Sequence, residues 1–369
     1  MAGVSPLWLA QPSRFAALSR TRARIGLVLL ALLVALCLTA LATPAPPAAT
    51  GAGRAEDQAD VVLYEGIVEG VRHGGRYYEV AAQALRAGDY PLRPFVTFRL
   101  PTLAVIQGAV PALVTIGLLY VLAFAVLLAW AIRLVPALNR RPPVIVALAL
   151  LAGGMVAFVQ SELAAFHEIW AGLFIALSLA LRRPGRWVEA VALGLVAMLI
   201  RETAALYVAV MCLAAWLEGQ RREAIGWAAS VAVLAVVVML HAQAVAEVVR
   251  PLDPASPGWA GMLGFGFFVT TLSVSTALML APLWLAAILV ALSFAGWAAW
   301  RDPLATRALA MFVSYGALLA LFGRPDTFYW GLMIAPTFLI GLAFAPDALR
   351  DLIGRARDRR RITVTRSAA

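Results

Sequence analysis

The sequence contains no lysine, only two cysteines and few charged residues of any kind. Charged residues make up 14% of the 369-residue chain, whereas hydrophobic residues make up 63%. A water-soluble protein of this length needs more polar surface, so the composition excludes an ordinary soluble globule. Cys37 and Cys212 both lie in apolar stretches, which argues against a disulfide framework and a cysteine-based metal site. The sequence therefore predicts an all-α polytopic membrane protein.

The absence of lysine leaves arginine as the strongly basic residue, and its distribution is uneven. The chain carries 30 basic and 20 acidic residues, a net charge of +10. In a soluble protein this charge would suggest nucleic-acid binding. Here the arginines cluster beside long apolar runs, the distribution that orients membrane helices. We therefore expect the lipid bilayer as a partner, and no nucleic acid.

The arginine clusters divide the chain into regions by the rule that positive residues stay on the cytoplasmic side. About ten transmembrane helices are expected, with both termini cytoplasmic, in a multi-pass protein of a bacterial inner (plasma) membrane. The expected regions are a basic cytoplasmic N-terminus (1–24), a first transmembrane span (25–42), an outer, periplasmic loop (43–102), a multi-span transmembrane domain (103–345) and a basic cytoplasmic tail (346–369).

Two apolar stretches are long enough to be ambiguous. Leu103–Ile132 is expected to be one span that returns to the cytoplasm at Arg133. Trp187–Leu217 could be one long helix, but the arginines at its two ends would then lie on opposite sides of the membrane. We therefore expect two short spans there, with Arg201 and Glu202 at their outer tip.

The first span has a competing interpretation. Its arginine-rich start, apolar stretch and Ala40-Leu41-Ala42 also fit a secretory signal with a cleavage site. A retained span is the preferred interpretation, because no soluble domain follows that would need release.

The connections expected on the cytoplasmic side offer little chemistry. They are short and contain no glycine-rich phosphate loop and no kinase-like set of motifs, which argues against direct use of a nucleotide. Polar residues gather instead on the expected outer side. Charges near a membrane are costly unless paired or hydrated, so this accumulation indicates a wet outer cavity. The outer residues include Asp60, Tyr64, Glu65, Tyr90, Arg99, His167, Glu168, Arg201, Glu202, Asp326 and Tyr329.

Within the outer loop, apolar residues recur at helical spacing. Residues 61–71 are expected to form one helix that ends at Gly74-Gly75, and Tyr77–Ala87 a second helix closed by Gly88. Both patterns are amphipathic, as in helices that lie in the membrane interface. Asp60 stands where the first helix is expected to begin, so it is either a helix cap or a catalytic carboxylate.

Several local motifs accompany this layout. They are Tyr77-Tyr78 followed by Gly88-Asp89-Tyr90-Pro91, then His167-Glu168-Ile169-Trp170-Ala171-Gly172, Ile200-Arg201-Glu202 and Tyr329-Trp330-Gly331. With a first span, a long outer loop that opens with an aspartate, and many short spans after it, the chain resembles the GT-C class of integral-membrane glycosyltransferases. The resemblance covers most of the chain in layout.

The resemblance implies a transferase that moves a sugar from a polyprenyl-phosphate donor to an acceptor hydroxyl of a glycan, lipid or protein. In that class an Asp or Glu of the outer loop is the general base, a role that falls here on Asp60 or Glu65. The chain departs from the class in one respect, because Arg76 precedes the tyrosine pair and the aspartate lies well upstream. The base therefore stays open between the two carboxylates.

The departing lipid phosphate would need a cationic partner, and arginine offers a fork suited to phosphate oxygens. Arg201 is the first choice, although it could instead pair with Glu202 or another outer carboxylate. The other expected substrate-binding residues are Tyr64, Glu202, His167, Glu168 and Tyr329.

No metal site is expected from the histidines. The three histidines form no HExxH motif and no cysteine–histidine cluster, so His167-Glu168 supplies only half of a site. No other cofactor is indicated, and Mg²⁺ held by outer carboxylates is left as an alternative.

Two other functions compete with glycosyl transfer. A transporter or flippase for a lipid-linked or anionic solute is expected to show internal symmetry, whereas this chain has one long loop near its N-terminus. A structural subunit whose charges only pair is the third possibility. Sugar transfer at the outer membrane face is the sequence-based prediction.

Overall fold

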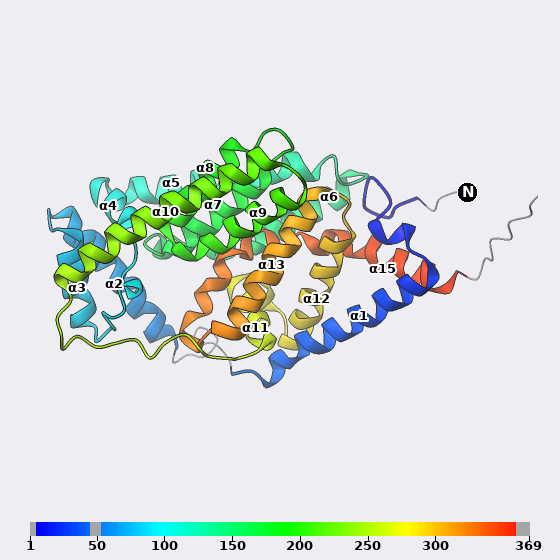
Figure 1. Ribbon diagram of the computed structural model, residues 1–369. Helices are drawn as coiled ribbons and strands as arrows, with labels where there is room; N and C mark the ends of the chain where they lie inside the picture. Colours follow the sequence, from blue (N-terminus) through cyan, green and yellow to red (C-terminus); the bar gives the residue numbers. More distant parts are fainter. Residues whose placement is uncertain (1–4, 45–52, 359–369) are drawn as a thin grey trace, which may run out of the picture.

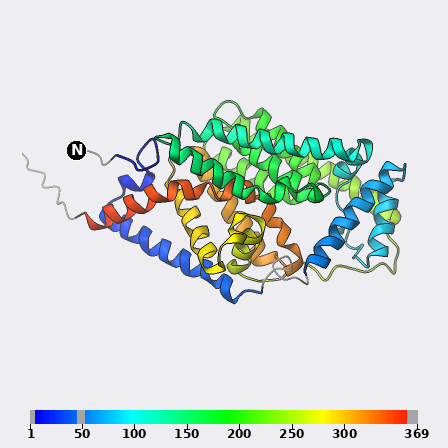
Figure 2. The same cartoon turned by 180° about the vertical axis from the view of Figure 1, so that it is seen from behind.

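The computed structural model describes residues 5–44 and 53–358, with backbone alone for 53–59. Every named element within these ranges is a helix, which confirms the all-α prediction. Figure 1 shows an elongated molecule with α2 (Gly53–Arg72), α3 (Tyr77–Ala87) and α4 (Thr102–Ala109) at one end. At the other end, α1 (Arg20–Leu38) lies beside α15 (Gly341–Arg357) in both views (Figures 1 and 2).

The helices between these ends differ in length, and only some are long enough to cross a bilayer. Four stretches qualify by length and composition: α1 with its 3-10 extension (Arg20–Ala42), α5 (Ala112–Leu134), α10 (Arg221–Val248) and α13 (Pro303–Phe322). A fifth is added if the pair Pro325–Met333 and Ala335–Arg357, bent by 59°, counts as one span. The shorter apolar helices are α6 (Arg141–Gly154), α7 (His167–Leu181), α8 (Val188–Ile200), α9 (Ala205–Leu217), α11 (Phe265–Ser275) and α12 (Leu283–Ala299).

The outer-loop helices follow the sequence pattern closely. The first expected helix is part of α2, which begins earlier, at Gly53, and ends before Gly74, whose positive φ of 87° suits glycine. The second matches α3 and ends at Gly88. Both helices bury their apolar faces in one small core that also contains Leu92 and Phe98.

The prediction that Leu103–Ile132 forms a single span is wrong, because the helix is broken between α4 and α5. Val110 is extended at φ −127° and ψ 154°, as the residue before a proline tends to be. Pro111 has no N–H with which to continue the helix. Since α4 packs against α2, the structural unit that contains α2 extends past Thr102, where the loop was expected to end.

The expected reversal within Trp187–Leu217 is confirmed. Arg201 interrupts the helical pattern at φ −142°, and Val208 of α9 lies beside Gly194 of α8. In one straight helix these two residues would be about 20 Å apart. The chain therefore turns back on itself, with Arg201 and Glu202 at the tip.

Most of the arginine-marked turns meet at one end of the bundle, here called the arginine pole. It comprises the segments around Arg14, Arg133, Arg182, Arg301 and Arg350. Arg133 donates to the carbonyl of Ala180, Arg14 to that of Asp302, and Arg301 to that of Ser13. The other end, which contains α2 to α4 and the α8–α9 tip, is called the distal pole.

The first and last described segments are joined at the arginine pole. The backbone N–H groups of Leu7, Trp8 and Leu9 donate to the carboxylate of Asp347 at 2.7, 2.8 and 2.9 Å. Ser13 donates to Asp351 at 2.7 Å. These bonds place both segments on the same side of the bundle.

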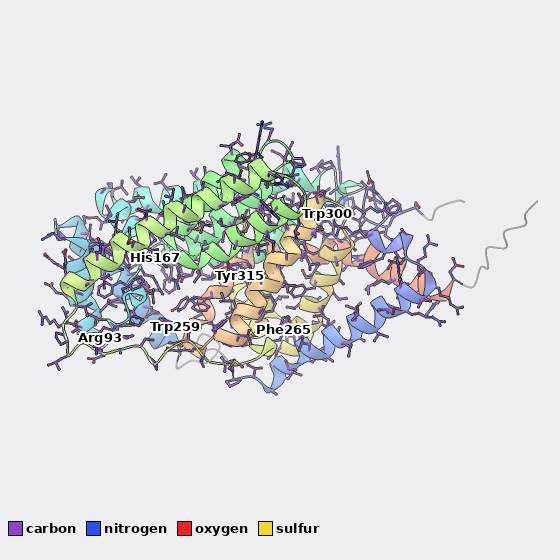
Figure 3. All side chains as sticks on the ribbon, in the orientation of Figure 1. Arg93, His167, Trp259, Phe265, Trp300 and Tyr315 are labelled. Carbon is purple, nitrogen blue, oxygen red and sulfur yellow. The ribbon has the colours of Figure 1, made fainter. Side chains whose placement is uncertain are left out.

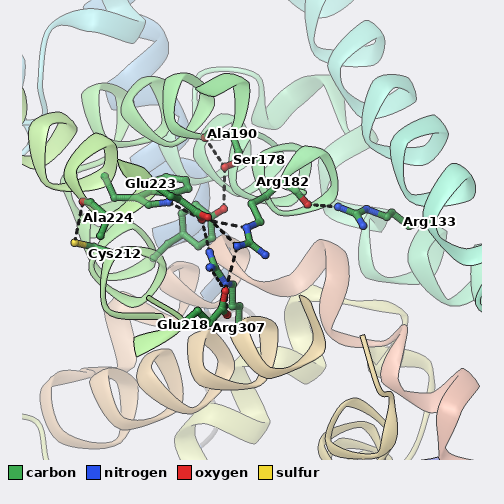
Figure 4. A network of polar contacts seen from close by, with 11 residues as sticks. Arg133, Ser178, Arg182, Ala190, Cys212, Glu218, Glu223, Ala224 and Arg307 are labelled. Atoms are coloured by element: carbon green, nitrogen blue, oxygen red, sulfur yellow. Dashed lines mark hydrogen bonds and ion pairs between the residues drawn. The ribbon is translucent and has the colours of Figure 1, made fainter. Parts of the chain in front are cut away.

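A buried ionic network also lies at this pole (Figure 4). Arg182 at the end of α7 and Arg307 of α13 both pair with Glu223 of α10, at 2.8 and 2.6 Å. Glu218, in the α9–α10 turn, pairs with the same two arginines. The side chains of Glu223 and Arg307 are 1% and 0% exposed, so each charge depends on its partners.

Replacing Arg307 tests this network. Arg307→Gln leaves Glu223 and Glu218 to share one arginine, and we expect it to destabilise the protein by about 3 kcal/mol. The measurement is thermal unfolding of purified protein in detergent. The control is Arg222→Gln, at an exposed position next to Glu223 in the first turn of α10. It should change the free energy of unfolding by no more than about 0.5 kcal/mol. Equal effects of the two changes would contradict a structural role for the network.

Candidate functional site

The candidate site at the distal pole begins with one face of α2. Asp60 and Tyr64 are four residues apart and lie on the same face of the helix. That face packs toward the start of α7, where the Tyr64 ring meets the rings of Phe166 and His167 edge-on at 5.6 and 5.1 Å. Glu65 is turned by about 100° and is exposed, so the structure does not bring it into this cluster.

Asp60 is not a helix cap. It lies well inside α2, which begins at Gly53, so the capping interpretation is wrong. Instead it accepts a hydrogen bond of 2.6 Å from the Tyr90 hydroxyl. Burial raises the pKa of Asp60. The Tyr90 hydrogen bond and the charge of Arg99 lower this pKa, and the charges of Glu168 and Asp326 raise it. Asp60 is thus a partly buried carboxylate of increased basicity.

Arg99 is the cation that acts most strongly on the pKa of Asp60, although the sequence pattern gave it no role beyond membership of the outer polar residues. Its guanidinium lies over the Tyr64 ring, 5.9 Å from the centroid, and reaches the Tyr329 hydroxyl at 3.5 Å. Among the described side chains no carboxylate oxygen lies within 4.0 Å of it, and its buried Nε has no hydrogen-bond partner. Arg99 therefore forms no direct ion pair, and the carboxylates of Glu168 and Glu202 stabilise its charge only from beyond ion-pair distance.

Arg201, unlike Arg99, is surrounded by carboxylates. It pairs with Glu168 at 2.5 Å and with Glu202 at 3.0 Å, and its side chain is only 5% exposed. Glu202 also accepts a hydrogen bond from the backbone N–H of Leu100. Two carboxylates already balance this charge, so Arg201 holds the α8–α9 tip against α7 and against the residue that follows Arg99.

His167 lies in the interior of the cluster. It is 3% exposed, and neither of its ring nitrogens has a hydrogen-bond partner. Glu168 is also buried, and its Oε2 has no partner. A pocket of about 10 Å³, room for roughly one water molecule, adjoins the histidine between Tyr64, Tyr77 and Gln107. Unpaired polar atoms beside such a space mark a place where water or a ligand group is stabilised.

The structure thus gathers most of the residues expected from sequence. Asp60, Tyr64, His167, Glu168, Arg201, Glu202 and Tyr329 form one cluster, joined by Tyr90 and Arg99, which were not selected. Tyr90 belongs to Gly88-Asp89-Tyr90-Pro91, and Arg99 stands between the buried Phe98 and Leu100. A charged residue between two apolar ones was the available sequence signal for Arg99. Figure 3 shows His167 well separated from Trp300, which lies at the arginine pole.

The carboxylates and histidines of this site do not form a metal centre. Among the described residues no three His, Cys, Asp or Glu side chains are arranged to hold a metal ion. Arg201 occupies the space beside Glu168 and Glu202 that a cation would need. The cluster is therefore suited to proton transfer and anion binding through its own side chains.

Comparison with known proteins adds no further information about the site. No family model matches the chain, and no curated protein or solved structure is significantly similar to it.

The buried pair of Arg201 and Glu168 gives a test of the cluster. Arg201→Gln leaves Glu168, 1% exposed, without its main partner, and should destabilise the protein by about 3 kcal/mol. Removing both charges in Arg201→Gln/Glu168→Gln should recover part of that loss, because the buried Glu168 charge is gone and only the more exposed Glu202 is left without its arginine. Thermal unfolding of the wild type and the two variants measures this. A double variant less stable than the single one would show that the pair is not the dominant interaction.

Proposed function

We propose that this protein is a membrane glycosyltransferase that moves a sugar from a polyprenyl-phosphate donor to an acceptor hydroxyl of a glycan, lipid or protein. One observation carries the proposal, namely a carboxylate of raised pKa, Asp60, beside a cation without an ion pair, Arg99. The first group suits proton abstraction and the second suits a departing phosphate.

Asp60 acts as the general base in this proposal. Its Oδ1 holds the Tyr90 hydroxyl, which leaves Oδ2 for the acceptor. As the acceptor oxygen bonds to the anomeric carbon, its proton passes to Asp60 and the bond between that carbon and the phosphate oxygen breaks. The lipid phosphate leaves with the electron pair. General-base catalysis of this kind contributes roughly 100- to 10,000-fold to the rate.

Arg99 takes the phosphate-binding role that the sequence analysis gave to Arg201. Arg201 is neutralised by two carboxylates, whereas Arg99 is free to pair with an incoming anion. The Tyr64 ring and the Tyr329 hydroxyl hold the Arg99 guanidinium in place. Glu65 is exposed and lies away from this cluster, which favours Asp60 as the base.

The proposal includes an orientation in the bacterial inner membrane. The arginine pole would face the cytoplasm by the positive-inside rule, with both termini on that side. The site at the distal pole would then face outward, where sugars arrive on lipid carriers. Five of the short apolar helices, α6, α7, α8, α9 and α12, would also cross the membrane, and α11 would belong to the outer segment. With the four long spans and the bent pair this gives the expected ten spans, and a 13-residue helix covers about 20 Å of a hydrocarbon core about 30 Å thick.

Asp60→Asn tests the catalytic role. Asparagine keeps the size of the side chain and can accept the Tyr90 hydrogen bond, but it cannot take up the proton. We expect transfer from synthetic polyprenyl-phosphate sugars to fall at least roughly 100-fold. Glu65→Gln is the matched control and should keep its activity. If Asp60→Asn stays active and Glu65→Gln is inactive, Glu65 is the base. If both stay active, the carboxylate mechanism is wrong.

Tyr90→Phe tests the pKa of the base. The Tyr90 hydroxyl stabilises ionised Asp60, so its removal should raise a pKa that burial has already raised. Because the ionised form is active, the acidic limb of kcat/KM against pH should move to higher pH, while the rate at high pH persists. Tyr120→Phe, at an exposed position on α5, should leave the profile unchanged. A shift to lower pH in Tyr90→Phe would contradict the assignment.

Cysteine labelling tests the orientation. Ser161→Cys lies at the distal pole and Thr306→Cys at the arginine pole, and both positions are exposed. With Cys37 and Cys212 replaced by serine, an impermeant thiol reagent should label position 161 in intact spheroplasts. Position 306 should be labelled only after permeabilisation. The reverse pattern would overturn the proposed orientation.

A further inference from the structure

A second polar pocket lies at the arginine pole, away from the candidate site. Its volume is about 260 Å³, and three chain segments enclose it. These are residues 9–11 near the N-terminus, the end of α5 with the residues that follow it, and the α12–α13 turn. The lining includes Arg133, Trp300, Arg301 and Asp302. The side chain of Trp300 is 6% exposed and forms one side of the pocket.

Three arginines at this pocket are fixed by backbone carbonyls. Arg133 Nε donates to the carbonyl of Ala180 at 2.7 Å, and Arg301 Nη2 to that of Ser13 at 3.1 Å. Arg14, next to the pocket, donates through Nη2 to the carbonyl of Asp302 at 3.0 Å. These bonds hold the guanidinium groups in position but do not neutralise them.

The charges around the pocket do not balance. Among the described side chains no carboxylate oxygen lies within 4.0 Å of Arg14, Arg133 or Arg301, in contrast to the paired arginines of the network nearby. The one acid in the lining is Asp302, whose Oδ1 accepts the N–H of Leu304 at the start of α13. Burial lowers the pKa of Arg14, Asp302 raises it, and Arg301 lowers it again. The arginines thus repel one another across a site with too few anions.

We propose that this pocket binds an anionic phosphate group, one whose charge is not offset by an attached ammonium group. Phosphate oxygens accept hydrogen bonds from guanidinium forks, and a bound phosphate would supply the negative charge that the arginines lack. Two sources share this chemistry, an anionic phospholipid headgroup and free phosphate. The pocket adjoins the end of α5, a candidate membrane span, where basic pockets between helices meet headgroups. It is independent of sugar transfer at the opposite pole.

Native mass spectrometry of the full-length protein tests the proposal, with three probes added separately. The probes are phosphatidylglycerol, phosphatidylethanolamine and inorganic phosphate. Arg14→Gln/Arg301→Gln removes two of the three cations and keeps Arg133, which also anchors the end of α7. We expect phosphatidylglycerol to bind the double variant roughly 25-fold more weakly, since each arginine contributes about 1 kcal/mol.

The second variant is Arg301→Gln alone, a change at an exposed position. The matched control is Arg22→Gln, at an exposed position in the first turn of α1. Loss of phosphatidylglycerol binding in the double variant, with a smaller loss in Arg301→Gln and none in Arg22→Gln, supports a lipid headgroup. The same pattern with inorganic phosphate alone supports a free anion. The proposal is overturned if the wild type binds neither probe, if phosphatidylethanolamine binds equally well, or if Arg22→Gln loses as much as the double variant.

Discussion

A charge removed from water needs a partner of opposite sign, and this requirement governs the polar interior of the protein. The chain is poor in charged residues, yet several of them are buried. Arg182 and Arg307 share Glu218 and Glu223 at one pole, and Arg201 pairs with Glu168 and Glu202 at the other. Each group joins the ends of helices distant in sequence. The pairs therefore fix how the ends of the short apolar helices are aligned with one another.

The exceptions to this pairing are the places where chemistry is proposed. Arg99 and the arginines of the second pocket are held by a hydroxyl, an aromatic ring or backbone carbonyls rather than by carboxylates. Asp60 is held by a hydroxyl rather than by a paired arginine. A charge restrained in this way keeps its capacity to bind an ion or exchange a proton. The two poles therefore combine ionic networks, which hold the bundle together, with charges that lack an ion-pair partner, and the proposed ligands would bind at the latter.

Much of this arrangement was predictable from the sequence, because local patterns decide it. The amphipathic helices of the outer loop, the glycine at the end of α3 and the reversal at Arg201 all follow from spacing and charge. The break before α5 was missed, since the apolar run on both sides hid the effect of Pro111. The capping role of Asp60 was wrong because α2 begins at Gly53, seven positions earlier than Asp60. The position of Arg201 suggested an anion-binding residue, but the structure shows the alternative, in which Arg201 pairs with Glu202 and another carboxylate, Glu168.

The sequence by itself determined that the chain is helical, rich in apolar helices and divided into an arginine-marked side and a polar side. Composition and hydrophobic period decide these properties, and both are local. Only the tertiary structure decided which arginines are neutralised by a carboxylate and which have no ion-pair partner. Glu168 and Arg201 are 33 positions apart, and Asp60 and Tyr90 are 30 apart. Whether a charge is paired depends on which distant helix end lies within about 4 Å of it, and the packing of the bundle sets that distance.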